Sequence, residues 1–211
     1  MIVLINPNST ISMTETMLQT ARATAPQTTF EGWTSHDGPP AIQGRADGDA
    51  ATPPLLALVR KSSDAGASAI IIACFDDTAL TQARQIAACP VIGIGQAAYH
   101  MAALAGNRFS VVTTLGVSVP VLVENIANYG LSGHVARVRA SEVPVLALET
   151  DPDAARARVI AEIVAAEKDD AVQSVVLGCG GMTGIPEAAK PHTNIRLIDG
   201  VRAAAHIASA L

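Results

Sequence analysis

Short apolar runs alternate with longer, Ala-rich polar stretches along the 211-residue chain. Runs of Ile, Val and Leu bounded by turn residues are typical of strands buried on both faces. They predict strands at Ile2–Asn6, Thr29–Trp33, Ala69–Cys74, Val91–Ile94, Phe109–Thr113, Val135–Val138, Ser174–Cys179 and Arg196–Ile198. The stretches between them predict helices at Ile11–Ala25, Thr52–Ala65, Thr78–Ala87, Gln96–Ala105, Pro120–Tyr129, Pro152–Asp169 and Val201–Leu211. This alternation predicts an α/β fold with parallel sheets, and the Gly/Pro/Asp-rich stretch His36–Ala50 predicts a loop long enough to act as a lid.

The second half of the chain repeats the pattern of the first half. Ile70–Cys74 aligns with Val175–Cys179 at an offset of 179 − 74 = 105 residues, and a polar turn and a helix follow each cysteine. A repeat of this kind predicts two pseudo-symmetric α/β units that face one cleft. We expect the first unit to comprise residues 1–96 and 200–211 and the second unit to comprise residues 97–199.

Cys74 and Cys179 occupy equivalent places in this repeat, each at the carboxyl end of a strand. Open α/β sheets bind ligands at those ends, so we expect the two thiols on opposite walls of the cleft, with space for a planar ring between them. Backbone N–H groups near the thiols are expected to lower their pKa values. One thiolate then removes a proton from a carbon acid while the opposite thiol delivers one. The alternative is that both are structural, as buried cysteines often are; Cys89 has no counterpart and is interpreted as structural.

The amino-acid composition argues against several classes of binding partner. The formal net charge is −5 and only 3% of residues are aromatic, which argues against nucleic-acid binding. No apolar run is long enough for a membrane span, and the N-terminus lacks the features of a signal peptide. The three cysteines have no regular close spacing and suit a reducing compartment. We therefore expect a cytoplasmic homo-oligomer with a small-molecule substrate and no nucleic-acid or membrane partner.

No cofactor or metal site is predicted. The five histidines have no metal-ligand spacing. The "GIGQAA" of Gly93–Ala98 fits a dinucleotide-binding pattern but lacks the acidic residue expected about 20 positions later. Asp76 and Asp77 are better explained as caps of the helix expected from Thr78 than as metal ligands. A charge on Asp76 would raise the pKa of the Cys74 thiol, so we expect this carboxylate to point elsewhere or to be hydrogen-bonded.

Four motifs carry a family resemblance: "INPNST", "CFDDTAL", "RFSVVTT" and "LGCGGMTG". Together they resemble the Asp/Glu/hydantoin racemase superfamily, and within it the hydantoin/allantoin racemase branch. The resemblance implies a cofactor-independent racemase with two α/β units, in which Cys74 and Cys179 are the catalytic acid and base. It also implies a substrate site formed by Asn6, Asn8, Ser9, Phe75, Asp76, Thr113, Thr114, Gly180 and Gly181.

The chain departs from the branch at two points. Hydantoin racemases usually carry Gly and then Asp-Pro-Gly where this chain has Asp76, Asp77, Thr78 and Ala79, and Ala where it has Gly180. A racemase or epimerase of a 5-substituted hydantoin or allantoin is the first hypothesis. The alternatives are another superfamily activity (amino-acid racemase, maleate-type isomerase or malonate decarboxylase) and a non-catalytic small-molecule binding domain.

Overall fold

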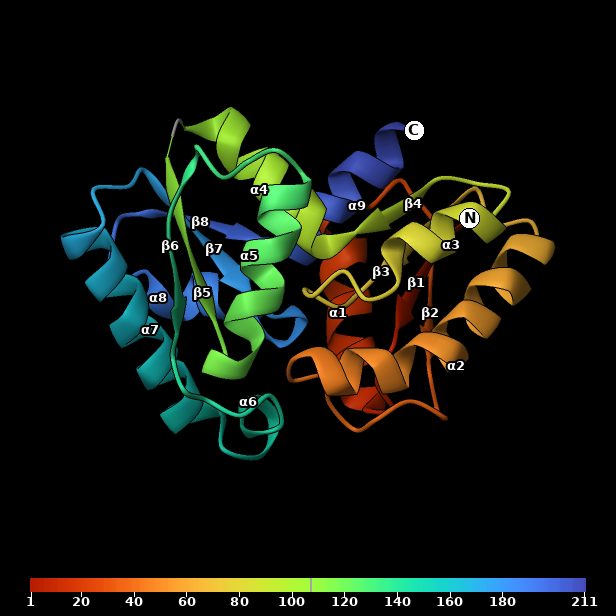
Figure 1. Ribbon diagram of the computed structural model, residues 1–211, viewed down its shortest axis with the longest axis horizontal. Helices are drawn as coiled ribbons and strands as arrows, with labels where there is room; N and C mark the ends of the chain where they lie inside the picture. The colour runs from red at the N-terminus through yellow and green to blue at the C-terminus, as the bar shows by residue number, and fades with distance from the viewer. Residues whose placement is uncertain (107) are drawn as a thin grey trace.

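The computed structural model describes residues 1–106 and 108–211, and these form two four-stranded parallel sheets (Figure 1). The first sheet has the order β2-β1-β3-β4 and the second the order β6-β5-β7-β8. The strands are β1 (Ile2–Asn6), β2 (Phe30–Thr34), β3 (Ala69–Ile72), β4 (Val91–Gly93), β5 (Phe109–Thr113), β6 (Val135–Ala140), β7 (Ser174–Gly178) and β8 (Arg196–Asp199). Every predicted strand is present, and the identical strand orders confirm the two similar α/β units.

Helices cover both sheets. They are α1 (Ile11–Thr24), α2 (Arg45–Asp64), α3 (Leu80–Ile86), α4 (Ile94–Ala105), α5 (Val119–Asn128), α6 (Ala147–Thr150), α7 (Pro152–Asp169), α8 (Ile185–Ala189) and α9 (Gly200–Ala210). The sequence did not reveal α6 and α8, because four or five residues are too few to show a helical period. Among the described residues, no helix has both the length and the hydropathy of a membrane span.

The predicted loop at His36–Ala50 is wrong in its second half. Helix α2 begins at Arg45 and continues through Pro53 and Pro54. Proline has no N–H to offer the carbonyl four residues earlier, so Asp49 and Ala50 lose their helical partners. Both residues are exposed, and water can therefore satisfy these carbonyls without interrupting the helix.

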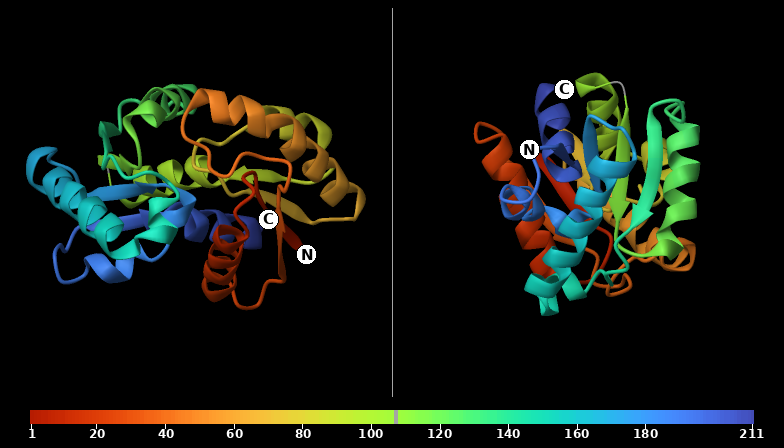
Figure 2. Two further views of the ribbon diagram at one scale, coloured as in Figure 1. Left: turned by 90° about the horizontal axis from the view of Figure 1, so that it is seen from below. Right: turned by 90° about the vertical axis from the view of Figure 1, so that its left-hand side faces the viewer.

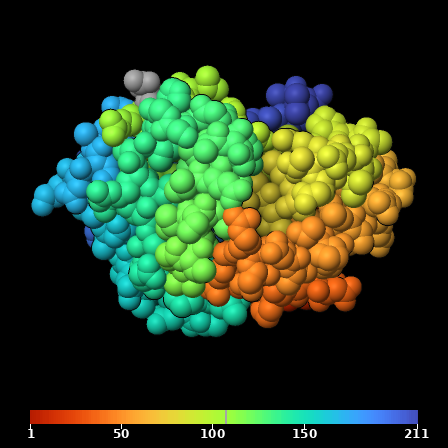
Figure 3. All heavy atoms as spheres, viewed as in Figure 1, coloured from red at the N-terminus to blue at the C-terminus, as the bar shows by residue number. Residues whose placement is uncertain are grey.

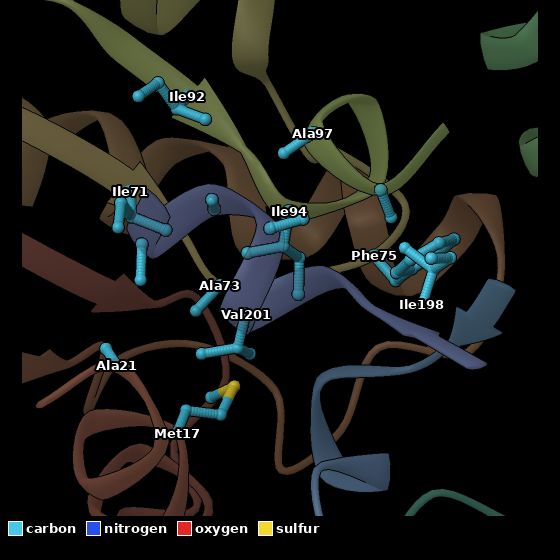
Figure 4. Packing of buried hydrophobic residues seen from close by; sticks show 14 of the residues in the cluster. Met17, Ala21, Ile71, Ala73, Phe75, Ile92, Ile94, Ala97, Ile198 and Val201 are labelled. Atoms are coloured by element: carbon cyan, nitrogen blue, oxygen red, sulfur yellow. The ribbon is translucent and has the colours of Figure 1, made fainter. Parts of the chain in front are cut away.

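Helices α4 and α9 join the two units by packing across to the opposite sheet. Helix α4 follows the last strand of the first sheet yet contacts β7 and β8, while α9 follows β8 yet contacts α1, β3 and β4. Figure 2 shows α9 (dark blue) beside the N-terminal helix α1 (red). Met17 of α1, Ile94 of α4 and Val201 of α9 belong to one core cluster, drawn in Figure 4. The assignment of residues 200–211 to the first unit and the boundaries of both units stay predictions.

Asp77 caps α4, and not the helix that follows it in the sequence. Its carboxylate accepts hydrogen bonds from the backbone N–H groups of Gly95 at 3.0 Å and Gln96 at 2.7 Å, and from the Tyr129 hydroxyl at 2.8 Å. A Cβ atom at Gly93 would lie 2.0 Å from the Asp77 carboxylate. The glycines of "GIGQAA" therefore make room for a carboxylate of the same chain, which accounts for the resemblance to a dinucleotide-binding pattern.

We predict that Asp77→Ala lowers the free energy of unfolding by about 1–3 kcal/mol, because one buried and two partly buried donors lose their acceptor. Chemical denaturation monitored by circular dichroism measures the change. Asp153→Ala is the matched control: Asp153 lies in the first turn of α7 with its side chain 96% exposed, and its loss should change stability by less than about 0.5 kcal/mol. Equal stabilities of the two variants would contradict the capping role of Asp77.

Candidate active site

Cys74 and Cys179 line one cavity between the two sheets. Cys179 directly follows β7, and Cys74 follows the equivalent strand β3 after one further residue. Both cysteines are free thiols. The pseudo-symmetric topology brings these two strand ends together, as the repeat predicted. Other predicted site residues in the cavity lining are Asn8, Phe75, Asp76, Thr113, Thr114, Gly180 and Gly181.

Asn6 and Ser9 lie outside the cavity lining. The Asn6 side-chain amide donates to the Asn8 side-chain oxygen at 2.9 Å and to the Thr14 hydroxyl at 3.0 Å. The Ser9 backbone N–H donates to the carbonyl of Pro39 at 2.9 Å. Asn6 therefore supports the site indirectly by fixing Asn8, which does line the cavity.

The cavity has an apolar part that the sequence did not reveal. Met13 and Met17 of α1 line it together with Ile42 and Val145, which come from loops. A Cβ atom at Gly180 would lie 2.6 Å from the Met17 sulfur, so glycine after the second cysteine makes room for this methionine. No periodic signal marks Ile42 or Val145, since a loop residue has no helical or strand pattern that indicates its burial.

Two loops close the cavity. The first cap, residues 35–44, follows β2 and contributes Ile42; the second cap, residues 141–146, follows the equivalent strand β6 and contributes Val145. The Val145 backbone N–H donates to the Gln43 side-chain oxygen at 2.9 Å, which joins the caps across the two units. Arg45, at the start of α2, pairs with Glu124 of α5, and Figure 3 shows this end of α2 (orange) against α5 (green).

The enclosed space is smaller than a planar ring requires. The centre of a water-sized sphere has only about 30 Å³ in which to move, and a single ordered water needs about 10–15 Å³ on this measure. The expectation of space for a ring between the thiols is therefore wrong for this conformation, because the caps bring Ile42 and Val145 into the cleft. A ring-sized ligand has to displace them.

The thiols have raised pKa values, contrary to the expectation from the strand-end position. Burial raises the pKa of Cys179 to about 11, opposed by a hydrogen bond from the Gly181 backbone N–H. Burial, followed by the charge of Asp76, raises the pKa of Cys74 well above its ordinary range. The Thr78 hydroxyl donates to the Cys74 sulfur at 3.4 Å and lowers its pKa, but not enough to offset desolvation.

Asp76 lies beside the thiols, so the expectation that its charge points elsewhere is wrong, whereas the alternative expectation, that the carboxylate is hydrogen-bonded, holds for one contact, from the Gly44 backbone N–H. The side chain lines the cavity, and one carboxyl oxygen, Oδ2, is buried without a hydrogen-bond partner among the described residues. Burial raises the pKa of Asp76 to about 7, opposed by a hydrogen bond from the Gly44 backbone N–H.

Thr113 and Phe75, two further predicted site residues, make contacts within the protein. The Thr113 hydroxyl donates to the Gly178 carbonyl at 2.9 Å, which ties β5 to β7 below Cys179. The Phe75 ring packs edge-on against Tyr99 with centroids 5.3 Å apart, so it belongs mainly to the core.

Across residues 1–106 and 108–211, no group of three or more His, Cys, Asp or Glu side chains is arranged to hold a metal ion.

Comparisons with known proteins give one consistent result. The model of the family described as Asp/Glu/hydantoin racemase matches residues 2–208. A hydantoin racemase from Rhizobium meliloti is 43% identical over 209 residues, which is 99% of this chain and 87% of that protein. The structure of an allantoin racemase from Klebsiella pneumoniae superposes with a TM-score of 0.95 at 38% identity, covering 100% of this chain and 86% of that one. An allantoin racemase from Pseudomonas fluorescens gives 0.94 at 34% identity, covering 100% and 89%.

We predict slow alkylation near neutral pH of Cys74 and Cys179, which are partly exposed in the cavity but have raised pKa values. The thiolate is the nucleophile, so with its pKa raised to about 11 Cys179 should react with iodoacetamide about tenfold faster for each pH unit from 7 to 10. Peptide mapping by mass spectrometry at timed quenches gives the rate of each cysteine. The same chain unfolded in urea is the control, and there all three cysteines should react at the rate of an ordinary thiol. Equal rates of Cys179 in the folded and unfolded chain at pH 7 would show that burial does not protect it.

Proposed function

The chain belongs to the Asp/Glu/hydantoin racemase family, and on this premise we propose that it is a cofactor-independent racemase or epimerase of a small carbon acid, namely a 5-substituted hydantoin or allantoin. The observation that carries the proposal is the meeting of two thiols from equivalent strand ends in one cavity. A non-catalytic binding domain has no need for matched thiols. We include in the proposal a cytoplasmic location and a homo-oligomeric assembly.

The proposed chemistry uses one thiol on each face of the substrate carbon. The thiolate of one cysteine removes the proton from the carbon next to a carbonyl group. The negative charge is delocalised onto the carbonyl oxygen, and the opposite thiol donates its proton to the other face, which inverts the configuration. In the reverse direction, Cys74 and Cys179 exchange these duties.

The local hydrogen bonds support both roles of each thiol. A thiolate at Cys74 is stabilised by the Thr78 hydroxyl and the Asp76 backbone N–H, and one at Cys179 by the Gly181 backbone N–H. Burial favours the neutral thiol, which is the form required of the proton donor. The cavity therefore suits a pair in which one sulfur is charged and the other neutral, because two thiolates this close in a buried site would repel each other.

The central experiment replaces each cysteine by serine. Racemisation needs both faces, so Cys74→Ser and Cys179→Ser should each lower kcat by at least about 100-fold, since a hydroxyl hardly ionises near neutral pH. The remaining thiolate can still remove a proton from the enantiomer that it faces and return deuterium to the same side. Proton NMR of each pure enantiomer in D2O should therefore show exchange of one enantiomer by one variant and of the opposite enantiomer by the other.

Cys89→Ser is the matched control, because Cys89 lies outside the cavity lining, and it should retain the turnover of the unmodified protein. Exchange of the same enantiomer by both site variants, or racemisation at an undiminished rate by either, would contradict the assignment of one thiol to each face.

A separate prediction concerns metals and cofactors. We expect the purified protein to retain full racemase activity, followed by polarimetry, after dialysis against excess chelator and without added nucleotide or pyridoxal phosphate. The reason is that two thiols and backbone donors suffice for proton transfer at a delocalised carbon acid. Loss of activity that a single added metal restores would refute the cofactor-independent mechanism.

A further inference from the structure

The Asp76 side chain stands between two spaces. On one side is the closed cavity that contains both thiols. On the other side is a more open polar groove, with about 260 Å³ for the centre of a water-sized sphere, between the first turns of α2, α3 and helix α5. Asp76 lines both spaces, so whatever occupies the thiol cavity meets this carboxyl group.

Contacts from both units hold Asp76 in this place. The Gly44 backbone N–H of the first cap hydrogen-bonds its carboxylate. Its main-chain carbonyl accepts a hydrogen bond from the Asn125 side-chain amide of α5 at 2.8 Å. The neighbouring Asp77 is anchored on α4 and Tyr129. These contacts position Asp76 between the two spaces.

One oxygen of this positioned group has no hydrogen-bond partner in the part of the chain that the structure describes. Oδ2 of Asp76 is shut off from solvent and lacks a hydrogen-bond donor among the described residues. A buried carboxyl oxygen without a donor destabilises the folded protein, so it is a group that a ligand donor can satisfy. A second carboxylate placed beside it in this low-dielectric site would be repelled.

We propose that Asp76 accepts a hydrogen bond from a substrate N–H and so selects neutral carbon acids that carry an N–H group, such as cyclic ureides, over carboxylate-bearing carbon acids. The inference rests on the proposed function, because it places the substrate between the thiols. It goes further in assigning substrate selection to one oxygen atom of a residue that takes no part in the proton transfers.

The test compares two proteins with three substrates at pH 8.5. Wild-type protein and Asp76→Ala are assayed by polarimetry with a 5-substituted hydantoin and with its two N-methyl isomers, each methylated on a different ring nitrogen. The wild type should lose kcat/KM by tenfold or more, about 1.4 kcal/mol, with one isomer, because methylation removes the donor. Asp76→Ala should lose activity with the parent hydantoin and no longer distinguish it from that isomer.

Asp49→Ala is the matched control. Asp49 lines the open groove but not the thiol cavity, and its replacement should leave the discrimination between the methyl isomers unchanged. If Asp76→Ala discriminates as the wild type does, or if the wild type treats both methyl isomers like the parent, the role of Asp76 is refuted.

A binding measurement keeps the inference testable without turnover. The ring-opened N-carbamoyl amino acid carries a carboxylate in place of the ring amide. In thermal-shift titrations the N-carbamoyl amino acid should bind Asp76→Asn at least tenfold more tightly than it binds the wild type. The hydantoin should show the opposite preference and bind the wild type more tightly than Asp76→Asn. Equal affinities of both proteins for the carboxylate would overturn the proposed selection. Absence of racemisation of any hydantoin by the wild type would instead contradict the proposed function, and the binding result would still decide the role of Asp76.

Discussion

The close crossing of α4 and α9 is the contact on which the arrangement of the two units depends. Each helix follows the last strand of one sheet and packs against the other sheet, so neither unit is complete without a helix that lies across the junction. The approach is possible because the crossing helices present small residues. A Cβ atom at Gly200 of α9 would lie 2.7 Å from the carbonyl oxygen of Ile94 of α4. This packing fixes the carboxyl ends of β3 and β7 around a shared cavity.

The adjacent carboxylates Asp76 and Asp77 have different roles: Asp77 stabilises this junction, and Asp76 belongs to the candidate active site. Burial raises the pKa of both Asp76 and Asp77 to about 7. Asp77 accepts hydrogen bonds from α4 and from Tyr129, which follows α5, and serves the fold, whereas Asp76 lines the thiol cavity and has one oxygen without a hydrogen-bond partner among the described residues. The two residues share one turn, in which Asp77 has a left-handed backbone with φ of 49°, and Asp77 hydrogen-bonds to α4 and Tyr129 while Asp76 lines the cavity.

Burial determines how the two thiols can act. Removing a sulfur from water favours the protonated form more strongly than nearby backbone N–H groups favour the thiolate. The same caps leave only about 30 Å³ in the cavity for the centre of a water-sized sphere. Opening of the caps would therefore admit both the ligand and the solvent that thiolate formation requires, and closure around a ligand would strengthen every electrostatic interaction inside.

The sequence predicts the α/β class, the positions of the strands, the two-unit repeat and the equivalence of Cys74 and Cys179, because each depends on local hydrophobic patterns and on their recurrence at a fixed offset. It also identified the family through short motifs around those positions. The tertiary structure alone decided which helix Asp77 caps, that Asp76 faces the thiols, that Ile42 and Val145 close the cavity and that the thiol pKa values are raised. These properties depend on which atoms from distant parts of the chain meet and on how much water they exclude, and no local pattern of residues carries that information.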